Sequence, residues 1–263
     1  MDQATAKALK LALRDQECLL ATWLTNCDPM MVEAIASGGF DTCILDTEHG
    51  PITAAGALMT QIIADRCGVP LLVRVPGPEP TAIAAALDNG AAGVVVPRVQ
   101  SAAQAAEAIA MAHYPPRGSR GFGPRRASGY LRRVDDYLNR AHESTIVIVQ
   151  VETKGAIDEI DQILALPDLD GILVGRNDLS MELGLPRDPA DPRLTQITRD
   201  LLGRARAAGL GAGIASAGRV EAALAARDLG ANLVAAGIDV EYLATAIDAF
   251  VQQARSQIDH KQE

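Results

Sequence analysis

The sequence has few aromatic residues and no excess of positive charge. Phe, Trp and Tyr make up 3% of its 263 residues, so the core must be built mainly from aliphatic side chains and alanine. Lys and Arg number 24 against 33 Asp and Glu, which gives a formal net charge of −9. Because a nucleic-acid-binding surface needs clustered positive charge, this balance argues against nucleic acid as a partner.

Long apolar runs and an export signal are also missing. No stretch approaches the roughly 18 consecutive apolar residues that cross a bilayer, and residues 1–20 lack the apolar block and cleavage site of a signal peptide. We therefore expect a cytoplasmic protein with no membrane partner. None of the four cysteines stands in a CxxC spacing. They lie inside or beside apolar segments and are predicted to be buried free thiols: Cys18, Cys27, Cys43 and Cys67.

Short aliphatic runs bounded by Gly, Pro or acidic residues recur along the chain. They are apolar nearly throughout, which is typical of strands in a parallel sheet that is buried on both faces. No GxGxxG follows the first run and no GxxxxGK[ST] occurs, so neither nucleotide-binding loop is present. The predicted strands are Leu19–Trp23, Phe40–Asp46, Pro70–Val75, Gly93–Pro97, Thr145–Glu152, Asp170–Gly175, Gly211–Ala215 and Asn232–Gly237.

Helical patterns lie between these runs. Ser101 and Gln104 form a capping-box start for one helix, and the others are predicted over 53–65, 81–87, 156–164, 194–208 and 220–229. Eight strand–helix units in a chain of this length favour a single-domain (β/α)8 TIM barrel, with an open parallel sheet as the alternative. A helix before the first strand and a long one from Val240 to about Gln257 are extra, and we expect such helices to cap the barrel base or to reach a neighbouring subunit.

One irregular segment, YPPRGSRGFGPRRASGY at 114–130, separates the fourth and fifth strands. Long ordered loops inside compact domains are usually functional or lie at an interface. We expect a subunit interface or an active-site rim here, with an anion site and a solvated loop as alternatives.

Charged residues follow four of the predicted strands, in DTEHG (46–50), VRVP (73–76), QVET (150–153) and GRNDLS (175–180). In a barrel the carboxyl ends of all strands meet at one face, where active sites form. The sequence therefore predicts that these four segments converge on one site.

Two carboxylates of this rim are candidate metal ligands. Side chains alternate across a strand, so Gln150 and Glu152 should face the barrel axis, where a lone carboxylate needs a cation. Asp178 supplies a second carboxylate, and a hard divalent ion such as Mg²⁺ or Mn²⁺ would relieve the repulsion between the two. The alternative is that Asp178 caps the next helix while Glu152 pairs with Arg74 or Lys154.

His49 and Arg74 are candidates for the chemistry itself. With Asp46, and possibly Asp88, close enough to orient the ring, His49 could act as a general base near neutral pH. Arg74 could pair with a substrate carboxylate or with charge developing on an oxygen. Alternatively, the His49 imidazole is a loop side chain bonded to the main chain, and Arg74 forms a structural salt bridge at the barrel mouth.

These residues and spacings resemble the HpcH/HpaI aldolases, the metal-dependent class II pyruvate aldolases. The resemblance runs from about residue 23 to 237 and includes FDTCILDTEHG, VRVP, LDNGAAGVVVPRVQSAAQA, YPPRGSRGFGP, QVET and the DLS of GRNDLS. It implies a (β/α)8 barrel in which Glu152 and Asp178 ligate Mg²⁺ or Mn²⁺, with Co²⁺ also accepted. It also implies that His49 is the base, that Arg74 stabilises enolate or alkoxide charge, and that Gln150 and the backbone around Asn177 hold the keto acid.

The resemblance further implies an oligomer. Asp88 would raise the basicity of the histidine across a subunit contact, and terminal helices would exchange between partners in a homohexamer. The sequence departs from the family pattern at Arg176 and Asn177, where many members read Pro-Ala, and at VPGPEP (75–80), which replaces a Trp-Asn-Asp type segment. Both changes lie near the expected site and bear on substrate preference.

The implied reaction cleaves or forms a 4-hydroxy-2-oxo acid through the enolate of pyruvate or hydroxypyruvate, with an aldehyde as the second partner. No lysine stands at a strand end where a Schiff base would form, since Lys154 is expected to face outward, and this disfavours the class I route. Two rivals remain: an acyl-CoA lyase of the malyl-CoA or citryl-CoA type, and a noncatalytic metal-binding barrel.

Overall fold

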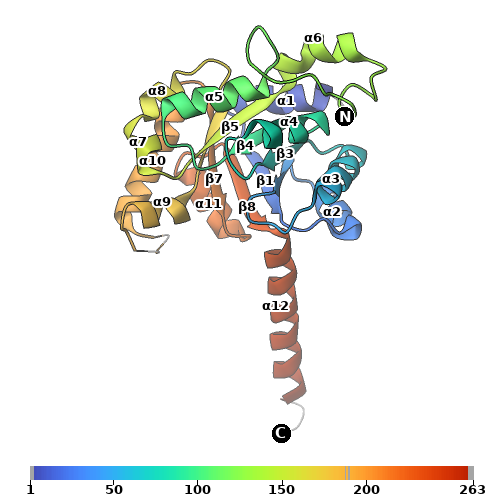
Figure 1. Cartoon of the computed structure of the whole chain (residues 1–263). Helices are drawn as coiled ribbons and strands as arrows, with labels where there is room; N and C mark the ends of the chain where they lie inside the picture. The colour runs from blue at the N-terminus through green and yellow to red at the C-terminus, as the bar shows by residue number, and fades with distance from the viewer. Residues whose placement is uncertain (1–2, 187, 189, 260–263) are drawn as a thin grey trace.

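Eight parallel strands form a closed barrel in this computed structural model, which describes residues 3–186, 188 and 190–259. Each strand pairs with the next along the chain, and β8 pairs with β1 (Figure 1). The structure thus confirms the (β/α)8 barrel and excludes the open sheet. The strands are β1 (Leu19–Leu24), β2 (Thr42–Asp46), β3 (Leu71–Arg74), β4 (Gly93–Val96), β5 (Ile146–Val151), β6 (Gly171–Val174), β7 (Gly211–Ser216) and β8 (Leu233–Ile238).

Helices surround the barrel and connect successive strands. They are α1 (Gln3–Arg14), α2 (Pro29–Ala36), α3 (Ala54–Cys67), α4 (Pro80–Asp88), α5 (Ala102–Ala112), α6 (Val134–Ser144), α7 (Lys154–Asp158), α8 (Ile160–Leu164), α9 (Arg176–Glu182), α10 (Pro192–Ala207), α11 (Val220–Asp228) and α12 (Asp239–Asp259). The first turn of α5 has the predicted cap, because Ser101 Oγ accepts the Gln104 amide at 3.2 Å. The Gln104 side chain accepts from the Gln100 amide instead of closing a capping box.

The alternation of strand β5 separates two apolar layers. Val147, Val149 and Val151 belong to the outer layer under the helices, whereas Ile146 and Ile148 belong to the cluster that fills the barrel. The predicted alternation of inward and outward side chains along β5 is therefore confirmed. The same alternation places Gln150 and Glu152 on the inward side, closer to the barrel mouth.

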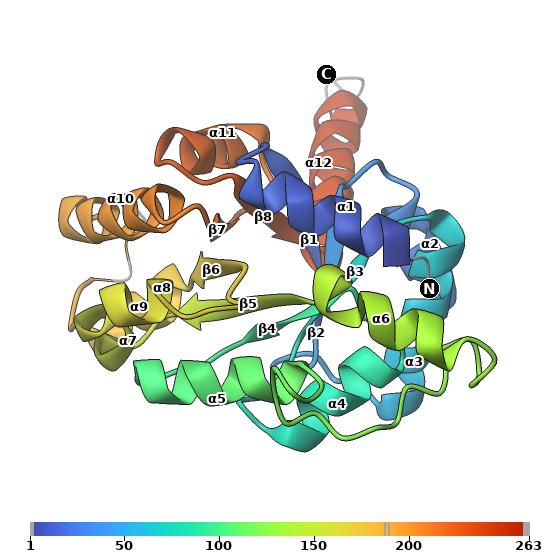
Figure 2. The same cartoon turned by 90° about the horizontal axis from the view of Figure 1, so that it is seen from above.

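Helix α1 closes the amino end of the barrel (Figure 2). Its Leu9 and Leu13 join the cluster inside the barrel. Lys10, 7% exposed, donates to the Thr145 carbonyl at 2.6 Å and lies 3.1 Å from buried Asp170. A buried ammonium is tolerated here because both a carbonyl and a carboxylate compensate its charge. This end of the molecule is thus sealed, which confirms the predicted capping of the barrel base by the first helix.

Three helical regions differ from expectation. Helix α2 was not predicted. The single helix predicted over 156–164 is divided into α7 and α8 at Glu159, whose carboxylate accepts the Ala102 amide at 2.7 Å. Helix α6 was not predicted; its apolar residues Tyr137 and Ala141 are few, and they are buried with Ala127 in a small cluster. Only Cys43 of the four cysteines is buried, so the expectation for Cys18, which is exposed, and for the half-buried Cys27 and Cys67 was wrong.

The irregular segment at 114–130 runs along the amino-end side of the barrel. Arg126 pairs with Asp65 at 2.5 Å and Arg120 with Asp88 at 2.5 Å, and both partners lie in the last turns of helices α3 and α4. Helices of a (β/α)8 barrel end near the amino ends of the strands. Within one chain the segment therefore forms no part of the active-site rim; its predicted role as a subunit interface stays a prediction.

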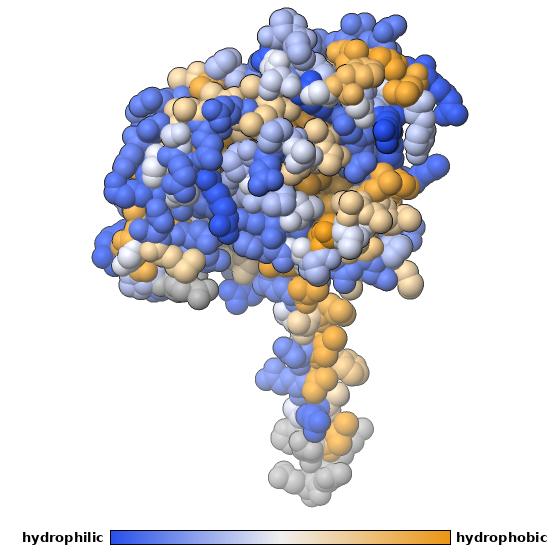
Figure 3. Space-filling view, viewed as in Figure 1, coloured by the Kyte–Doolittle hydropathy of each residue, from blue (hydrophilic) through white to orange (hydrophobic). Residues whose placement is uncertain are grey.

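Helix α12 leaves the carboxyl end of β8 and projects away from the barrel (Figure 1). Apolar side chains along it are exposed, including Leu243 (48%), Ile247 (52%) and Phe250 (72%). They form a continuous hydrophobic strip on one side of the helix (Figure 3). Among the described residues, no helix has the length and apolar character needed to cross a membrane.

Candidate active site

Asp46 and Arg74 form the centre of the site at the carboxyl ends of β2 and β3. Arg74 Nε and Nη2 bond the two carboxylate oxygens of Asp46 at 3.0 and 2.6 Å. Asp46 Oδ1 also accepts the main-chain amides of Glu48 and His49 at 3.1 and 3.2 Å. Burial pushes the pKa of Asp46 upward, but these bonds and the charge of Arg74 outweigh it and hold the pKa below its usual value. Asp46 thus holds the His49 main chain and the arginine.

The Arg74 guanidinium is held from three sides. It lies over the Trp23 ring at 4.5 Å, and its Nη1 donates to Gln150 Oε1 at 3.5 Å. Its Nε lies 3.4 Å from Glu48 Oε2. Stacking and paired hydrogen bonds fix the plane of the guanidinium, which prepares it to bind an oxyanion in one orientation.

Glu152 lies just beyond β5, where it receives two hydrogen bonds. The Arg98 main-chain amide donates to Glu152 Oε1 at 2.7 Å, and the Gln150 amide group donates to Oε2. Burial raises the pKa of Glu152, and the charges of Asp178 and Glu48 add to this effect against the two hydrogen bonds. The net result is a pKa above the usual range. The two groups that donate to this carboxylate, a main-chain amide and a side-chain amide, are both uncharged.

Glu48 and Arg98 belong to the same cluster, although sequence reasoning did not single them out. The Glu48 side chain is 7% exposed, and its Oε1 accepts from Arg98 Nε at 2.8 Å. Arg98 has a φ of 59°, a left-handed conformation that is rare for side chains with a Cβ and is common at functional sites. Both residues follow strands directly, in DTEHG and VVVPRVQ, so the strand-end rule could have found them.

Asp178 lies in the first turn of α9 and is exposed. The N-cap of α9 is Gly175, with no side-chain cap, so the alternative in which Asp178 caps this helix is wrong. The pairing alternatives for Glu152 are also wrong. Lys154 points outward to Asp158 at 2.5 Å, and Arg74 pairs with Asp46.

His49 lies at the rim, with its side chain 56% exposed. Its Nε2 is 3.8 Å from Glu48 Oε2. His113 and His142 lie elsewhere, beside a different cavity.

Two neighbouring cavities open at this rim. The larger, of about 370 Å³, is lined by His49, Glu152 and Asp178 together with Glu48, Arg98, Gln100, Thr153, Met181 and Glu182. The smaller, of about 120 Å³, is lined by Arg74, Gln150, Asn177 and Asp178 together with Trp23, Leu173, Val174, Gly175, Arg176 and Ala215. Asp178 belongs to both. The structure thus brings together all the predicted site residues except Asp88.

Asp88 lies at the other end of the barrel, as the last residue of α4. Its carboxylate pairs with Arg120, which is fully buried and stacks on the Tyr114 ring at 4.5 Å. Its carbonyl accepts the Ala127 amide at 3.2 Å. Within one chain Asp88 therefore does not orient His49; the predicted contact across a subunit boundary stays a prediction.

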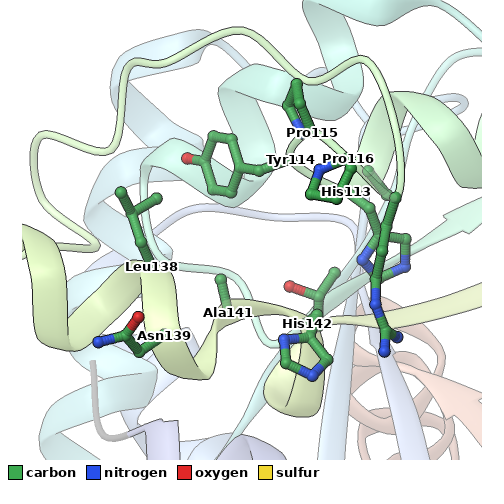
Figure 4. Close-up of a pocket in the computed structure, with 11 residues that line it drawn as sticks. His113, Tyr114, Pro115, Pro116, Leu138, Asn139, Ala141 and His142 are labelled. Atoms are coloured by element: carbon green, nitrogen blue, oxygen red, sulfur yellow. The ribbon is translucent and has the colours of Figure 1, made fainter.

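A further cavity of about 300 Å³ lies at this amino end (Figure 4). Tyr114, Pro115 and Pro116 face Leu138 and His142 of α6 across it. It contains none of the predicted site residues. Burial and the nearby charge of Lys10 lower the pKa of His113 to about 4, so this imidazole is neutral at pH 7.

The donors at the carboxyl-end rim fit a hard divalent cation. Glu152 and Asp178 offer carboxylate oxygens in one cavity, and burial together with the charge of Asp178 raises the pKa of Glu152. Mg²⁺ is often bound by one or two carboxylates, with water and substrate oxygens completing its shell. In the described part of the chain, no group of three or more His, Cys, Asp or Glu side chains could hold a metal ion. An ion held by these two carboxylates would take water and substrate oxygens as its other ligands.

Fold and site together define a (β/α)8 barrel with a cluster of candidate active-site residues at the carboxyl ends of its strands. The sequence profile of the family described as HpcH/HpaI aldolase/citrate lyase matches residues 19–246, and the chain belongs to this family. It is an enzyme of the aldolase/lyase type.

Similar proteins match nearly the whole chain. It is 33% identical over 260 residues to a 2-keto-3-deoxy-L-rhamnonate aldolase of Salmonella gallinarum, covering 97% of this chain and 96% of the relative. It is 35% identical over 245 residues to a hydroxypyruvate/pyruvate aldolase of Roseovarius nubinhibens, covering 92% and 94%. The structure of an HpcH/HpaI aldolase/citrate lyase family protein from Burkholderia cenocepacia superposes with a TM-score of 0.89 at 32% identity, covering 95% and 99%.

Proposed function

We propose that this protein is a divalent-metal-dependent class II pyruvate aldolase that cleaves or forms 4-hydroxy-2-oxo acids. The observation that carries the proposal is the shared cavity of Glu152, Asp178 and His49, next to a second cavity that contains Arg74 and Gln150. The names of the two aldolase relatives support a 2-oxo acid as one substrate. The smaller cavity, of about 120 Å³, would take pyruvate or hydroxypyruvate.

Glu152 and Asp178 are the proposed ligands of Mg²⁺ or Mn²⁺, with Co²⁺ as a substitute. A bound divalent cation supplies the positive charge that makes a 2-oxo acid easier to deprotonate. Gln150 and the main chain around Asn177 would hold the oxo acid, and Arg74 would bind charge developing on its oxygen. His49 would take the proton from the carbon next to the keto group, and the resulting carbanion equivalent would add to an aldehyde. Cleavage is the reverse.

The test is proton exchange at the methyl group of pyruvate, followed by NMR in D₂O. The wild-type protein with Mg²⁺ or Mn²⁺ is expected to exchange these protons, and EDTA should stop the reaction. Glu152→Ala and Asp178→Ala should abolish exchange while the melting temperature changes little. Asp158→Ala removes an exposed carboxylate outside both cavities and is the matched control, with exchange retained. Full exchange by Glu152→Ala in EDTA would refute the ligand assignment.

Cleavage assays separate this proposal from the rival acyl-CoA lyase. Release of pyruvate from a 4-hydroxy-2-oxo acid, dependent on added metal, is the expected result. Activity confined to malyl-CoA or citryl-CoA would establish the rival, and no turnover of either class with any metal would favour a noncatalytic barrel.

We also propose that the active protein is a homo-oligomer in which terminal helices contact partner subunits. The exposed apolar strip of α12 supports this, because a monomer would leave it in water. Asp88 would then reach His49 of a neighbouring subunit, as the resemblance to the family implies.

A further inference from the structure

A buried arginine holds one oxygen of the Asp88 carboxylate. The Arg120 side chain has no exposed surface, and its Nη2 donates to Asp88 Oδ1 at 2.5 Å. The guanidinium also lies over the Tyr114 ring at 4.5 Å. Stacking fixes the plane of the guanidinium, and the charge-assisted hydrogen bond then fixes the direction of the carboxylate.

The Arg120 side chain depends on Asp88 in turn. Its Nε and Nη1 are buried without a hydrogen-bond partner among the described residues, so Asp88 Oδ1 is the only acceptor that the described chain offers to this guanidinium. A buried charge is costly unless it is compensated, and a buried ion pair is often no more stabilising than apolar residues of the same volume. The value of this pair therefore lies in the geometry that it gives to Asp88.

The main chain fixes the arginine relative to the neighbouring helices. The Arg120 amide donates to the His113 carbonyl at 3.0 Å, and the Ser119 amide donates to the Ala110 carbonyl at 2.8 Å. Both acceptors lie at the end of α5, whereas Asp88 ends α4. The ion pair therefore joins two elements that are each held by main-chain hydrogen bonds, which leaves the carboxylate little freedom to turn.

The second oxygen of Asp88 is kept open by a glycine. Oδ2 makes no hydrogen bond within the described chain, and the Asp88 side chain is 24% exposed. A Cβ at Gly123 would lie 2.7 Å from Oδ2 and 3.6 Å from Cγ of this carboxylate. The two oxygens are thus divided, because Oδ1 is held by Arg120 while Oδ2 has room beside it to accept from a group outside the chain.

We propose that Arg120 is a positioning residue, which holds Asp88 so that Oδ2 accepts the one N–H of a neutral His49 imidazole from a neighbouring subunit. This rests on the proposed function, in which Asp88 reaches that histidine and His49 is the base. The other ring nitrogen keeps its lone pair to take the substrate proton. Arg120 acts only through Asp88, and Gly123 provides the space beside Oδ2.

A crystal structure of the oligomer tests this arrangement independently of activity. Asp88 Oδ1 should remain on Arg120, and Oδ2 should lie within about 3.2 Å of a ring nitrogen of His49 of a neighbouring subunit. An Oδ2 that meets no such histidine would overturn the inference. So would an Arg120 that pairs with a group of the neighbouring subunit in place of Asp88.

The kinetics of metal-dependent pyruvate exchange separate positioning from a purely structural role. Arg120→Met should lower kcat by about 10²-fold with little change in KM, the effect of a misplacement of about 1 Å in a catalytic site. In protein that already carries Asp88→Asn, Arg120→Met should add little, because both changes remove the same interaction. Arg117→Met breaks an exposed ion pair with Asp168 on the same segment and is the control, with wild-type kcat. Losses that multiply in the double variant would overturn the inference.

Because Arg120→Met removes a buried ion pair, a second pair of variants tests the same point with that pair intact. Gly123→Ala places a methyl group against Oδ2 and should lower kcat by about tenfold or more, with the oligomer mass unchanged in light scattering. Gly121→Ala is the control, since a Cβ there meets no atom within 4 Å. Wild-type kcat in Gly123→Ala would contradict the inference. If the wild type exchanges no protons with any metal, the proposed function fails, while the crystal structure still tests the placement of Asp88.

Discussion

Gly175 shows how tightly single residues are fitted around the proposed metal ligand. A Cβ at this position would lie 2.8 Å from Glu152 Oε2 and 3.1 Å from Gln150 Nε2. It would also lie 2.9 Å from Glu152 Cβ, which is not the end of a flexible side chain. The glycine therefore leaves room for the hydrogen-bonded pair that presents the carboxylate to the cavity.

We expect Gly175→Ala to reduce turnover strongly while preserving the fold. The methyl group must displace Glu152 or Gln150, and a misplacement of about 1 Å in a catalytic site can cost about 10²-fold in rate. Overpacking of this kind also lowers stability by about 1–3 kcal/mol. Gly203→Ala is the control, because a Cβ there meets no atom within 4 Å and alanine favours the α10 helix. Comparing kcat and thermal unfolding of both variants checks the prediction; wild-type turnover in Gly175→Ala would contradict it.

At the same scale, the sequence identified side chains better than it identified their partners. Alternation along β5 placed Gln150 and Glu152 toward the axis, as found. It could not show that Asp46 pairs with Arg74, because that contact depends on the stagger between β2 and β3. The strand-end rule marks Glu48 together with the other charges of DTEHG, but only the fold shows that the Glu48 side chain is the one buried against Arg98.

At the scale of elements, strands were easier to predict than helices. A strand buried on both faces is apolar throughout, so each of the eight was found within two residues of its observed start. Helix α6 has a mostly polar sequence, VDDYLNRAHES, and its position depends on packing against residues far away in the chain, such as Gln3, which donates to the Tyr137 carbonyl at 3.2 Å. The break between α7 and α8 likewise depends on Glu159 capping α5.

The end of α5 should make folding stability depend on pH. His113 is 2% exposed and has a pKa of about 4, below the 6.5 of a free imidazole. The unfolded chain therefore binds more protons than the folded one between these values, and stability falls as the pH decreases from about 6.5 to about 4. The full difference approaches about 3 kcal/mol.

Chemical denaturation at several pH values between 7 and 4.5 tests this. The wild type should lose stability more steeply with falling pH than His113→Gln, even though the variant is less stable at pH 7. Asn139→Gln, at a residue on the same cavity that does not titrate, is the control and should keep the wild-type slope. If the free energy of unfolding changes with pH equally in the wild type and in His113→Gln, then His113 does not titrate differently in the folded and unfolded states.

For the whole molecule, composition and periodicity were sufficient to predict one barrel with an extra helix at each end, because eight buried strands in 263 residues leave little choice of architecture. The predicted substrate depends on cavity walls contributed by several strands, which a linear sequence cannot assemble. The two terminal helices behave differently: α1 is packed into its own barrel, whereas α12 leaves its apolar strip exposed (Figure 3).

The strip on α12 predicts how assembly responds to mutation. Ile247 and Phe250 are 52% and 72% exposed in the single chain, and a buried contact with a partner would remove this apolar surface from water. A charge placed there would have to be desolvated in the contact, so Phe250→Glu should shift the protein to smaller assemblies by light scattering coupled to gel filtration. Gln252→Glu adds the same charge away from the strip and should leave the mass unchanged. If Asp88 also contacts His49 of a neighbouring subunit, the smaller assemblies should no longer exchange the protons of pyruvate. An unchanged mass for Phe250→Glu would exclude α12 from the contact.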